Sequence, residues 1–144
     1  MKRMTSFFVA ASALLLIATQ GLATEVTVYK SPYCGCCTAW SEHMRENGFE
    51  VTEIKRDDMD SIKRDMGVPG QLESCHTAVV DGYIVEGHVP ADDIIKLLQE
   101  RPKAKGLSVP GMPIGSPGME QGDHKDRFVT IMFDDTGLRA FARH

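Results

Sequence analysis

The sequence predicts one α/β domain, because strand-like and helix-like patterns alternate along a chain of 144 residues. Up to residue 101 the patterns read, in order, strand, helix, strand, helix, strand, strand, helix. Asp81-Gly82 lies between two short apolar runs, which is a strong signal for a two-residue hairpin. No internal repeat divides the chain. We therefore expect residues 24–144 to form a single domain with its own core.

Local patterns predict each element before residue 101. Residues 25–30 alternate and are rich in Val, so they predict a strand, and the Ser-Pro-Tyr of residues 31–33 ends it. In the next segment Cys37, Trp40 and Met44 recur at helical spacing and form one apolar face. The further predicted elements are a strand at 49–54, a short polar helix at 57–66, strands at 77–80 and 83–86, and a helix after Pro90.

The last third of the chain has a different character. Residues 103–126 are rich in Gly and Pro and carry Met112 and Met119, each after a Pro-Gly pair. Their periodicity is too weak for a helix or strand, so an extended Gly/Pro/Met loop is expected. Residues 128–133 predict one extra strand, closed by the turn residues 134–137, with a short tail after it.

The N-terminus has the pattern of a cleavable signal peptide over residues 1–23. Lys2 and Arg3 precede an apolar run at 7–19, and residues 21–23 end in a small-x-small cleavage pattern. The run is shorter than the roughly 20 residues of a membrane span. Without its two basic residues the exported chain has 14 basic and 20 acidic residues, a net charge of −6. This acidity argues against nucleic acid or an anionic membrane as partner.

Three cysteines crowd into four residues where the first strand gives way to the first helix. Cys34 and Cys37 have the C-x-x-C spacing of a redox pair, and Cys36 is left over. The start of a helix favours thiolate over thiol, and thiolate is both the reactive and the metal-binding form. A dithiol couple needs two sulfurs, whereas a soft-metal site gains from the third. The cluster therefore favours a metal site.

Cys75 would join this cluster if its loop returns to the same end of the sheet. A strand that starts at Thr77 beside the first strand would bring it there. The alternative for an exported chain is two disulfides. These would pair Cys34 with Cys37 and Cys36 with Cys75.

His76, beside Cys75, is the best histidine candidate for a ligand or a ligand's support. His88 is expected to be a hydrogen-bonded structural residue, with metal binding as the second interpretation. Met112 and Met119 offer soft thioethers, although apolar contacts that hold the loop are the commoner role. The remaining histidines, expected in exposed or polar segments without a role, are His43, His124 and His144.

Copper fits this ligand set better than zinc. Four thiolates suit Zn(II), but an all-cysteine zinc site usually draws on two separated pairs, and three ligands in four residues strain that tetrahedron. Cu(I) accepts two or three thiolates and tolerates bridging sulfurs. We therefore expect Cu(I), in more than one copy, with zinc as the less favoured ion.

Several motifs resemble those of one family. They are Cys34-Gly35-Cys36-Cys37, Ser74 to Thr77, Glu86 to Ala91, and the Pro-Gly-Met segments within 106–113 and 115–120. Together they resemble the DUF411 family, which includes CopG-type periplasmic copper-resistance proteins, over nearly the whole expected mature chain. The order of elements up to the last predicted helix is similar to the thioredoxin and glutaredoxin fold.

The resemblance implies copper binding, a role in copper tolerance, periplasmic location and possible interconversion of Cu(I) and Cu(II). It implies Cys34, Cys36, Cys37 and Cys75 as ligands, and other copper-handling proteins or an electron donor or acceptor as partners. In thioredoxins a proline facing the dithiol precedes the strand that starts here at Thr77. His76 takes that place, so docking of a substrate peptide beside the dithiol is in doubt.

Three functions remain open from the sequence. In the first, the protein holds Cu(I), and oxidation of Cys34 and Cys37 to a disulfide removes two ligands and releases metal. In the second, it is a thiol-disulfide oxidoreductase acting on periplasmic proteins. In the third, it is a passive metal sponge without electron transfer.

Overall fold

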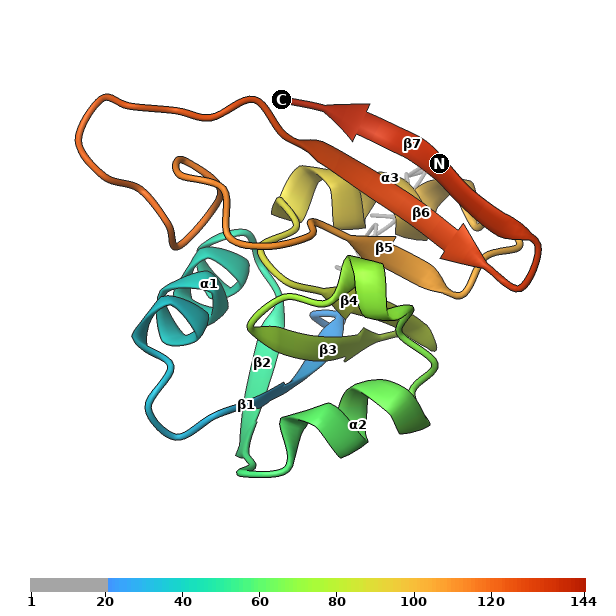
Figure 1. Cartoon of the computed structure of the whole chain (residues 1–144), viewed down its shortest axis with the longest axis horizontal. Helices are drawn as coiled ribbons and strands as arrows, with labels where there is room; N and C mark the ends of the chain where they lie inside the picture. Colours follow the sequence, from blue (N-terminus) through green and yellow to red (C-terminus); the bar gives the residue numbers. More distant parts are fainter. Residues whose placement is uncertain (1–20) are drawn as a thin grey trace, which may run out of the picture.

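A seven-stranded mixed sheet runs through the protein (Figure 1), in a computed structural model that describes residues 21–144. Most of the predicted signal peptide lies outside the described residues. The strands are β1 (Glu25–Lys30), β2 (Glu50–Lys55), β3 (His76–Val80), β4 (Tyr83–Glu86), β5 (Gly106–Ser108), β6 (Val129–Asp134) and β7 (Gly137–Arg143). The helices are α1 (Gly35–Glu46), α2 (Met59–Asp65) and α3 (Ala91–Glu100), with a 3-10 turn at Gly70–Leu72.

The strand order is β2-β1-β3-β4-β5-β6-β7, with β1/β2 and β4/β5 parallel and the other pairs antiparallel. This confirms the predicted α/β class and the extra C-terminal strand. Because β3 runs antiparallel to β1, Lys30 at the end of β1 pairs with His76 at the start of β3. The segments that carry Cys34 and Cys75 therefore meet at one end of the sheet.

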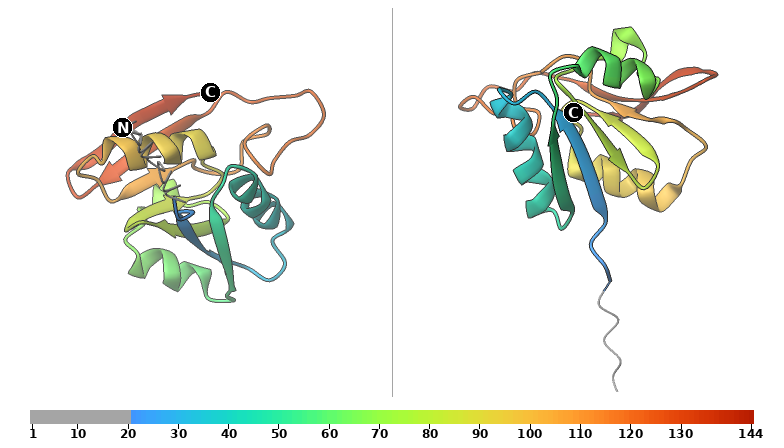
Figure 2. Two further views of the ribbon diagram at one scale, coloured as in Figure 1. Left: turned by 180° about the vertical axis from the view of Figure 1, so that it is seen from behind. Right: turned by 90° about the horizontal axis from the view of Figure 1, so that it is seen from below.

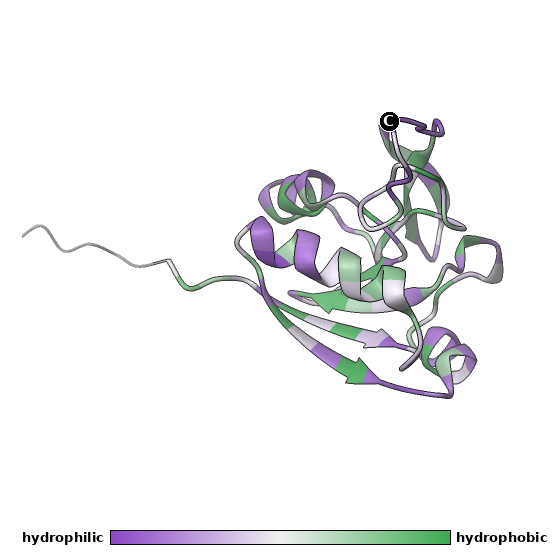
Figure 3. Cartoon of the chain, turned by 90° about the vertical axis from the view of Figure 1, so that its left-hand side faces the viewer, coloured by the Kyte–Doolittle hydropathy of each residue, from purple (hydrophilic) through white to green (hydrophobic). Residues whose placement is uncertain are grey.

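The helices cover both faces of the sheet (Figure 2), with α1 and α3 on one face and α2 on the other. Apolar and polar residues alternate along the strands (Figure 3), as expected for strands with differently covered faces. Trp40 is fully buried, and its Nε1 donates to the carbonyl of Val89 at 2.8 Å. The core under α1 and α3 contains Val26, Val28, Trp40, Met44, Ala78, Val80, Val85, Ile94, Leu97 and Leu107.

Two strands differ from the sequence prediction. β5 lies inside the segment expected to be an extended loop, and β7 replaces the expected short tail. β5 has only three residues, and its pairing with β4 and β6 defines it, so no local periodicity could reveal it. β7 has an irregular pattern with a register shift opposite Thr130/Ile131, and the preceding turn closes it into a hairpin with β6.

Two histidines, His43 and His144, make more contacts with the rest of the fold than the sequence suggested. His43 is half-buried, and its Nε2 accepts the backbone N–H of Ala91, the first residue of α3, at 3.1 Å. Desolvation lowers the pKa of His43. His144 stacks on Phe128, and its Nε2 lies 2.9 Å from the Asp93 carboxylate. The exposed position expected for His43 was therefore wrong, and His144 makes contacts that the sequence did not predict.

No helix within residues 21–144 is long and apolar enough to cross a membrane.

Candidate metal centre

The four cysteines gather at the end of the sheet where β1 ends and β3 begins. Cys34 and Cys37 form a disulfide whose Cα atoms are 5.3 Å apart. Cys36 Sγ lies 3.5 Å from Cys34 Sγ and 4.0 Å from Cys75 Sγ. All four sulfurs lie within 4.8 Å of one another. The predicted return of the Cys75 loop to the upstream cysteines is confirmed.

Local structure explains this convergence. Cys34 occupies the N-cap of α1, so Cys36 and Cys37 fall in the first helical turn. Cys37 is fully buried on the face that also carries Trp40. Cys34, Cys36 and Cys75 are only partly buried, so three of the four cysteines remain accessible from outside. The cluster therefore has one buried side, at Cys37, and one side open to solvent.

His88 lies directly against Cys75, with its Nε2 2.8 Å from the sulfur. The other ring nitrogen, Nδ1, is 2.7 Å from the carbonyl oxygen of Pro117. A carbonyl only accepts, so Nδ1 must carry a proton and donate to Pro117. In the neutral ring Nε2 then holds the free lone pair and accepts from the Cys75 thiol. The same lone pair is the one a metal ion would use.

His76 lies between the cysteines and the core. It is completely buried, its ring centroid is 4.5 Å from that of Trp40, and Nδ1 is 3.3 Å from Cys75 Sγ. Its Nε2 has no hydrogen-bond partner among the described residues. Burial, and secondarily His88, hold the pKa of His76 well below its usual value. His76 is therefore a neutral imidazole, which is the form that binds metals.

Cys75 is held as a thiol. Burial raises its pKa to about 12, and the neighbouring Cys36 sulfur adds to the rise. Desolvation likewise lowers the pKa of His88, which opposes a thiolate–imidazolium pair. A bound cation would invert this preference, because its positive charge stabilises the thiolate that it coordinates. Metal binding at Cys75 is therefore expected to release a proton.

The Gly/Pro/Met loop packs against the cluster through glycines. A Cβ on Gly118 would come within 2.8 Å of the Cys36 carbonyl oxygen and of the backbone nitrogen of Trp40. Gly111 accepts a hydrogen bond from the Ser74 hydroxyl, beside Cys75. Met112 is 52% exposed and follows Gly111, whereas the partly buried Met119 follows Gly118. Both methionines border the cluster through their neighbours, and their role as ligands remains a prediction.

Gly118→Ala is expected to destabilise the fold more than Gly48→Ala. Both glycines have a φ of 86°, so the left-handed strain is shared. Only the Gly118 methyl group would meet packed backbone, whereas nothing lies within 4 Å of the Cβ position at Gly48. The contact should cost about 1–3 kcal/mol more in the free energy of unfolding. Chemical denaturation of the two variants measures the difference, and equal losses would contradict the packing described.

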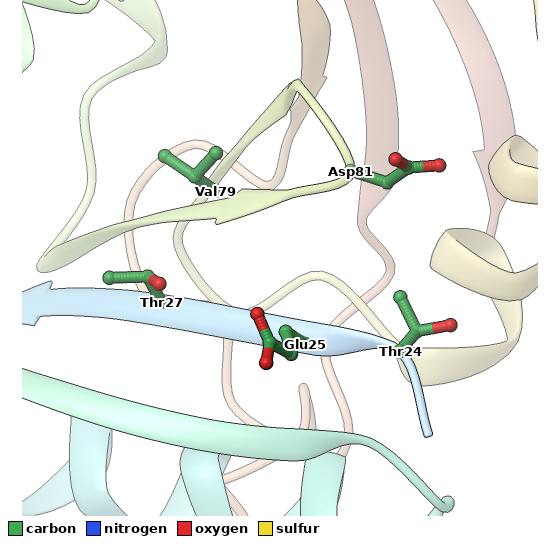
Figure 4. A pocket seen from close by; sticks show the side chains of 5 residues that line it. All are labelled: Thr24, Glu25, Thr27, Val79 and Asp81. Carbon is green, nitrogen blue, oxygen red and sulfur yellow. The ribbon is translucent and has the colours of Figure 1, made fainter. Parts of the chain in front are cut away.

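A hollow of about 470 Å³ lies at the opposite end of the sheet (Figure 4). Its lining residues are Thr24, Glu25, Thr27, Val79 and Asp81. They offer hydroxyls and carboxylates but no sulfur or imidazole, so a soft metal ion has no ligands there.

Known proteins resemble the chain in sequence and in fold. A sequence model of the family described as "Protein of unknown function, DUF411" matches residues 72–119. Two solved structures, copper resistance protein copG in Form 2 and in Form 1, share 45% identity with the chain. Each match covers 85% of this chain and 98% of the other, with TM-scores of 0.81 and 0.80. The chain belongs to the copG family within DUF411. No curated protein matches the chain.

Membership of the copG family confirms the resemblance drawn from the motifs. The segment matched by the DUF411 model contains Cys75, His76 and His88, but it begins after the C-x-C-C motif. The match to the copG structures extends over most of the chain. Family membership therefore rests on the whole fold as well as on the segment around Cys75.

The contact between His88 and Cys75 was underestimated from the sequence. His88 does make a structural hydrogen bond, as expected, but its second nitrogen faces the sulfur cluster. The predicted β3–β4 hairpin could have revealed this contact. Thr77 at the start of β3 pairs with Glu86 at the end of β4, so the residues just before β3 and just after β4 must also lie close together.

Proposed function

We propose that this protein is an exported copper-binding protein of copper resistance, which holds Cu(I) in the cluster of Cys34, Cys36, Cys37 and Cys75. The observation that carries the proposal is the convergence of four sulfurs, from segments 38 residues apart in sequence, within 4.8 Å of one another. Soft thiolates select soft ions, and crowded thiolates suit Cu(I) because each can bridge two ions. Membership of the copG family supports the same ion.

More than one copper ion fits the donor set. Two groups of metal-ligand atoms overlap: one contains the four cysteines, and the other contains Cys75, His76 and His88. Cys75 belongs to both groups, so its thiolate is placed to bridge ions held on either side. In a closed tetrahedral site that holds one zinc ion, no ligand is shared between ions. We therefore propose multinuclear Cu(I) binding, with His76 and His88 as additional ligands.

The redox state of Cys34 and Cys37 would control loading. Reduction of their disulfide adds two electrons and two protons, which an external dithiol or an electron-donor protein supplies, and yields two further ligands. Oxidation removes these ligands and releases the ions they held. A bound copper ion that passed between Cu(I) and Cu(II) would exchange one electron with a partner.

Competition between Cu(I) and Zn(II) tests the proposed ion. The reduced protein is titrated without oxygen against a chelator of known affinity for each ion. The proposal predicts tighter binding of Cu(I) than Zn(II) and a Cu(I) stoichiometry above one. Tight binding of a single Zn(II), with Cu(I) unable to displace it, would contradict the proposal.

A thiol-disulfide oxidoreductase is the second candidate, favoured by the Cys34–Cys37 disulfide at the start of α1. It predicts that Cys36→Ser leaves reduction of a disulfide substrate unchanged, while Cys34→Ser abolishes it. A passive metal sponge predicts tight Cu(I) binding without accelerated copper oxidation or reduction. Disulfide reductase assays and copper oxidation rates on the same samples separate these functions.

A further inference from the structure

A buried carboxylate lies behind the cysteine cluster, where α2 covers the sheet. Glu86, the last residue of β4, is fully buried. Its Oε1 accepts hydrogen bonds from Lys63 Nζ at 2.5 Å and from the backbone N–H of Ser74 at 2.7 Å. Its Oε2 accepts the hydroxyl of Thr77 at 2.6 Å. Lys63 Nζ also donates to Thr77 Oγ1 at 3.1 Å, which closes the network.

Two hydrogen-bond partners of Glu86 flank the candidate metal ligands Cys75 and His76 in the sequence. Ser74 precedes and Thr77 follows Cys75 and His76, so one carboxylate ties both ends of this dipeptide to β4. Gly87 adds a packing contact, since a Cβ there would lie 2.5 Å from the Ser74 side chain. The ties therefore fix where the Cys75 sulfur lies relative to Cys36.

Stability alone is a weak reason for an ion pair at this place. Replacing a buried ion pair with apolar residues of similar volume is often neutral or stabilising. The Glu86 carboxylate has no hydrogen of its own, so it can accept hydrogen bonds from three donors at once. An amide would offer a single acceptor oxygen and would direct an N–H group at one of the donors. Burial raises the pKa of Glu86, and the charge on Lys63 together with the three donated hydrogen bonds opposes this rise and favours the carboxylate form.

We propose that Glu86 is a positioning residue, which Lys63 holds in place and which keeps Cys75 beside Cys36 before any metal ion arrives. The inference rests on the proposed function, in which these sulfurs share soft ions, and it assigns a role to a group that touches none of the ligand sulfurs. A preorganised ligand loses less conformational freedom on binding, so the gain appears as affinity.

A trivalent phenylarsenical tests the position of the two sulfurs without copper. In the oxidised protein Cys36 and Cys75 are the free thiols. Phenylarsine oxide forms one As–S bond to each thiol, and its oxygen leaves as water with the two thiol protons, without electron transfer. One reagent molecule bridges the thiols only if they lie close together. Glu86→Gln is expected to weaken this bridging by about 10–100-fold, the usual range for loss of a group that orients a ligand.

Asp93→Asn is the matched control. Asp93 is a second buried carboxylate, and it accepts the Thr130 hydroxyl and contacts His144, away from the cysteines. Its loss should weaken the fold while changing arsenical affinity less than about twofold, because no partner of Asp93 adjoins a cysteine. Hydrogen exchange of the Ser74 amide provides a second readout, which should accelerate in Glu86→Gln and stay unchanged in Asp93→Asn.

Thr77→Val covers the case in which Glu86→Gln fails to fold. It keeps the ion pair and the side-chain shape but removes one of the two ties, so a severalfold loss of arsenical affinity is expected. Unchanged affinity in a folded Glu86→Gln or Thr77→Val variant would overturn the positioning role. If the arsenical results are as expected but the wild-type protein does not bind Cu(I), the positioning role stands and the proposed function fails.

Discussion

Replacement of Cys75 with Ser is expected to lower the Cu(I) affinity of the reduced protein by about 100-fold or more. Cys75 is the one cysteine outside the C-x-C-C segment, and its sulfur lies 4.0 Å from that of Cys36. Four-ligand zinc sites bind by roughly 10–16 kcal/mol, so one ligand contributes about 3 kcal/mol, a factor of about 100. Competition with a Cu(I) chelator measures the change. The stoichiometry should also fall, because a bridging ligand is lost.

Ser41→Ala is a suitable control for this experiment. Ser41 is buried on α1, its hydroxyl has no hydrogen-bond partner among the described residues, and it is not among the candidate ligands. Its replacement should leave Cu(I) affinity unchanged. Cys36→Ser should resemble Cys75→Ser, since Cys36 lies between Cys34 and Cys75. If Cys75→Ser bound Cu(I) as tightly and in the same number as the wild-type protein, the two segments would not share a site.

Oxidation of the Cys34–Cys37 pair is the second change with a large expected effect. The disulfide removes two of four sulfur ligands, so the oxidised protein should bind fewer Cu(I) ions than the reduced protein. On the same scale of about 3 kcal/mol for each ligand, the affinity of the remaining site should fall by several orders of magnitude. Anaerobic titration of protein prepared with and without a dithiol reductant measures both quantities.

The double variant Cys34→Ser, Cys37→Ser separates redox control from other effects of the reductant. It cannot form the disulfide, so its low Cu(I) affinity should be the same with and without reductant. Equal copper stoichiometry in the reduced and oxidised wild-type protein would remove the gating mechanism, while leaving Cu(I) binding by Cys36 and Cys75 possible.

Sequence patterns predicted the parts of the site that depend on the order of elements. The C-x-C-C segment follows the first strand, and the strand after Cys75 returns beside it, so convergence followed from topology. The C-x-x-C spacing likewise predicted that Cys34 and Cys37 would pair. Periodicity placed the helices within a few residues, because α1 and α3 bury one clear apolar face each.

Features that depend on side-chain contacts between distant segments were missed. Whether His88 faces a sulfur or solvent is decided by Pro117, 29 residues further along the chain. The sequence indicated no role for Glu86, because its role depends on hydrogen bonds from Lys63 on α2 and from the backbone N–H of Ser74. β5 is defined by its neighbours on both sides, so its three residues carry too little pattern to predict a strand.

A crystal structure of the reduced protein with Cu(I) tests the central claim most directly, since anomalous scattering at the copper edge locates each ion. We expect at least one copper ion bonded both to Cys75 and to a cysteine of the C-x-C-C segment. Copper bound by the upstream cysteines alone, with Cys75 beyond bonding distance, would contradict this account.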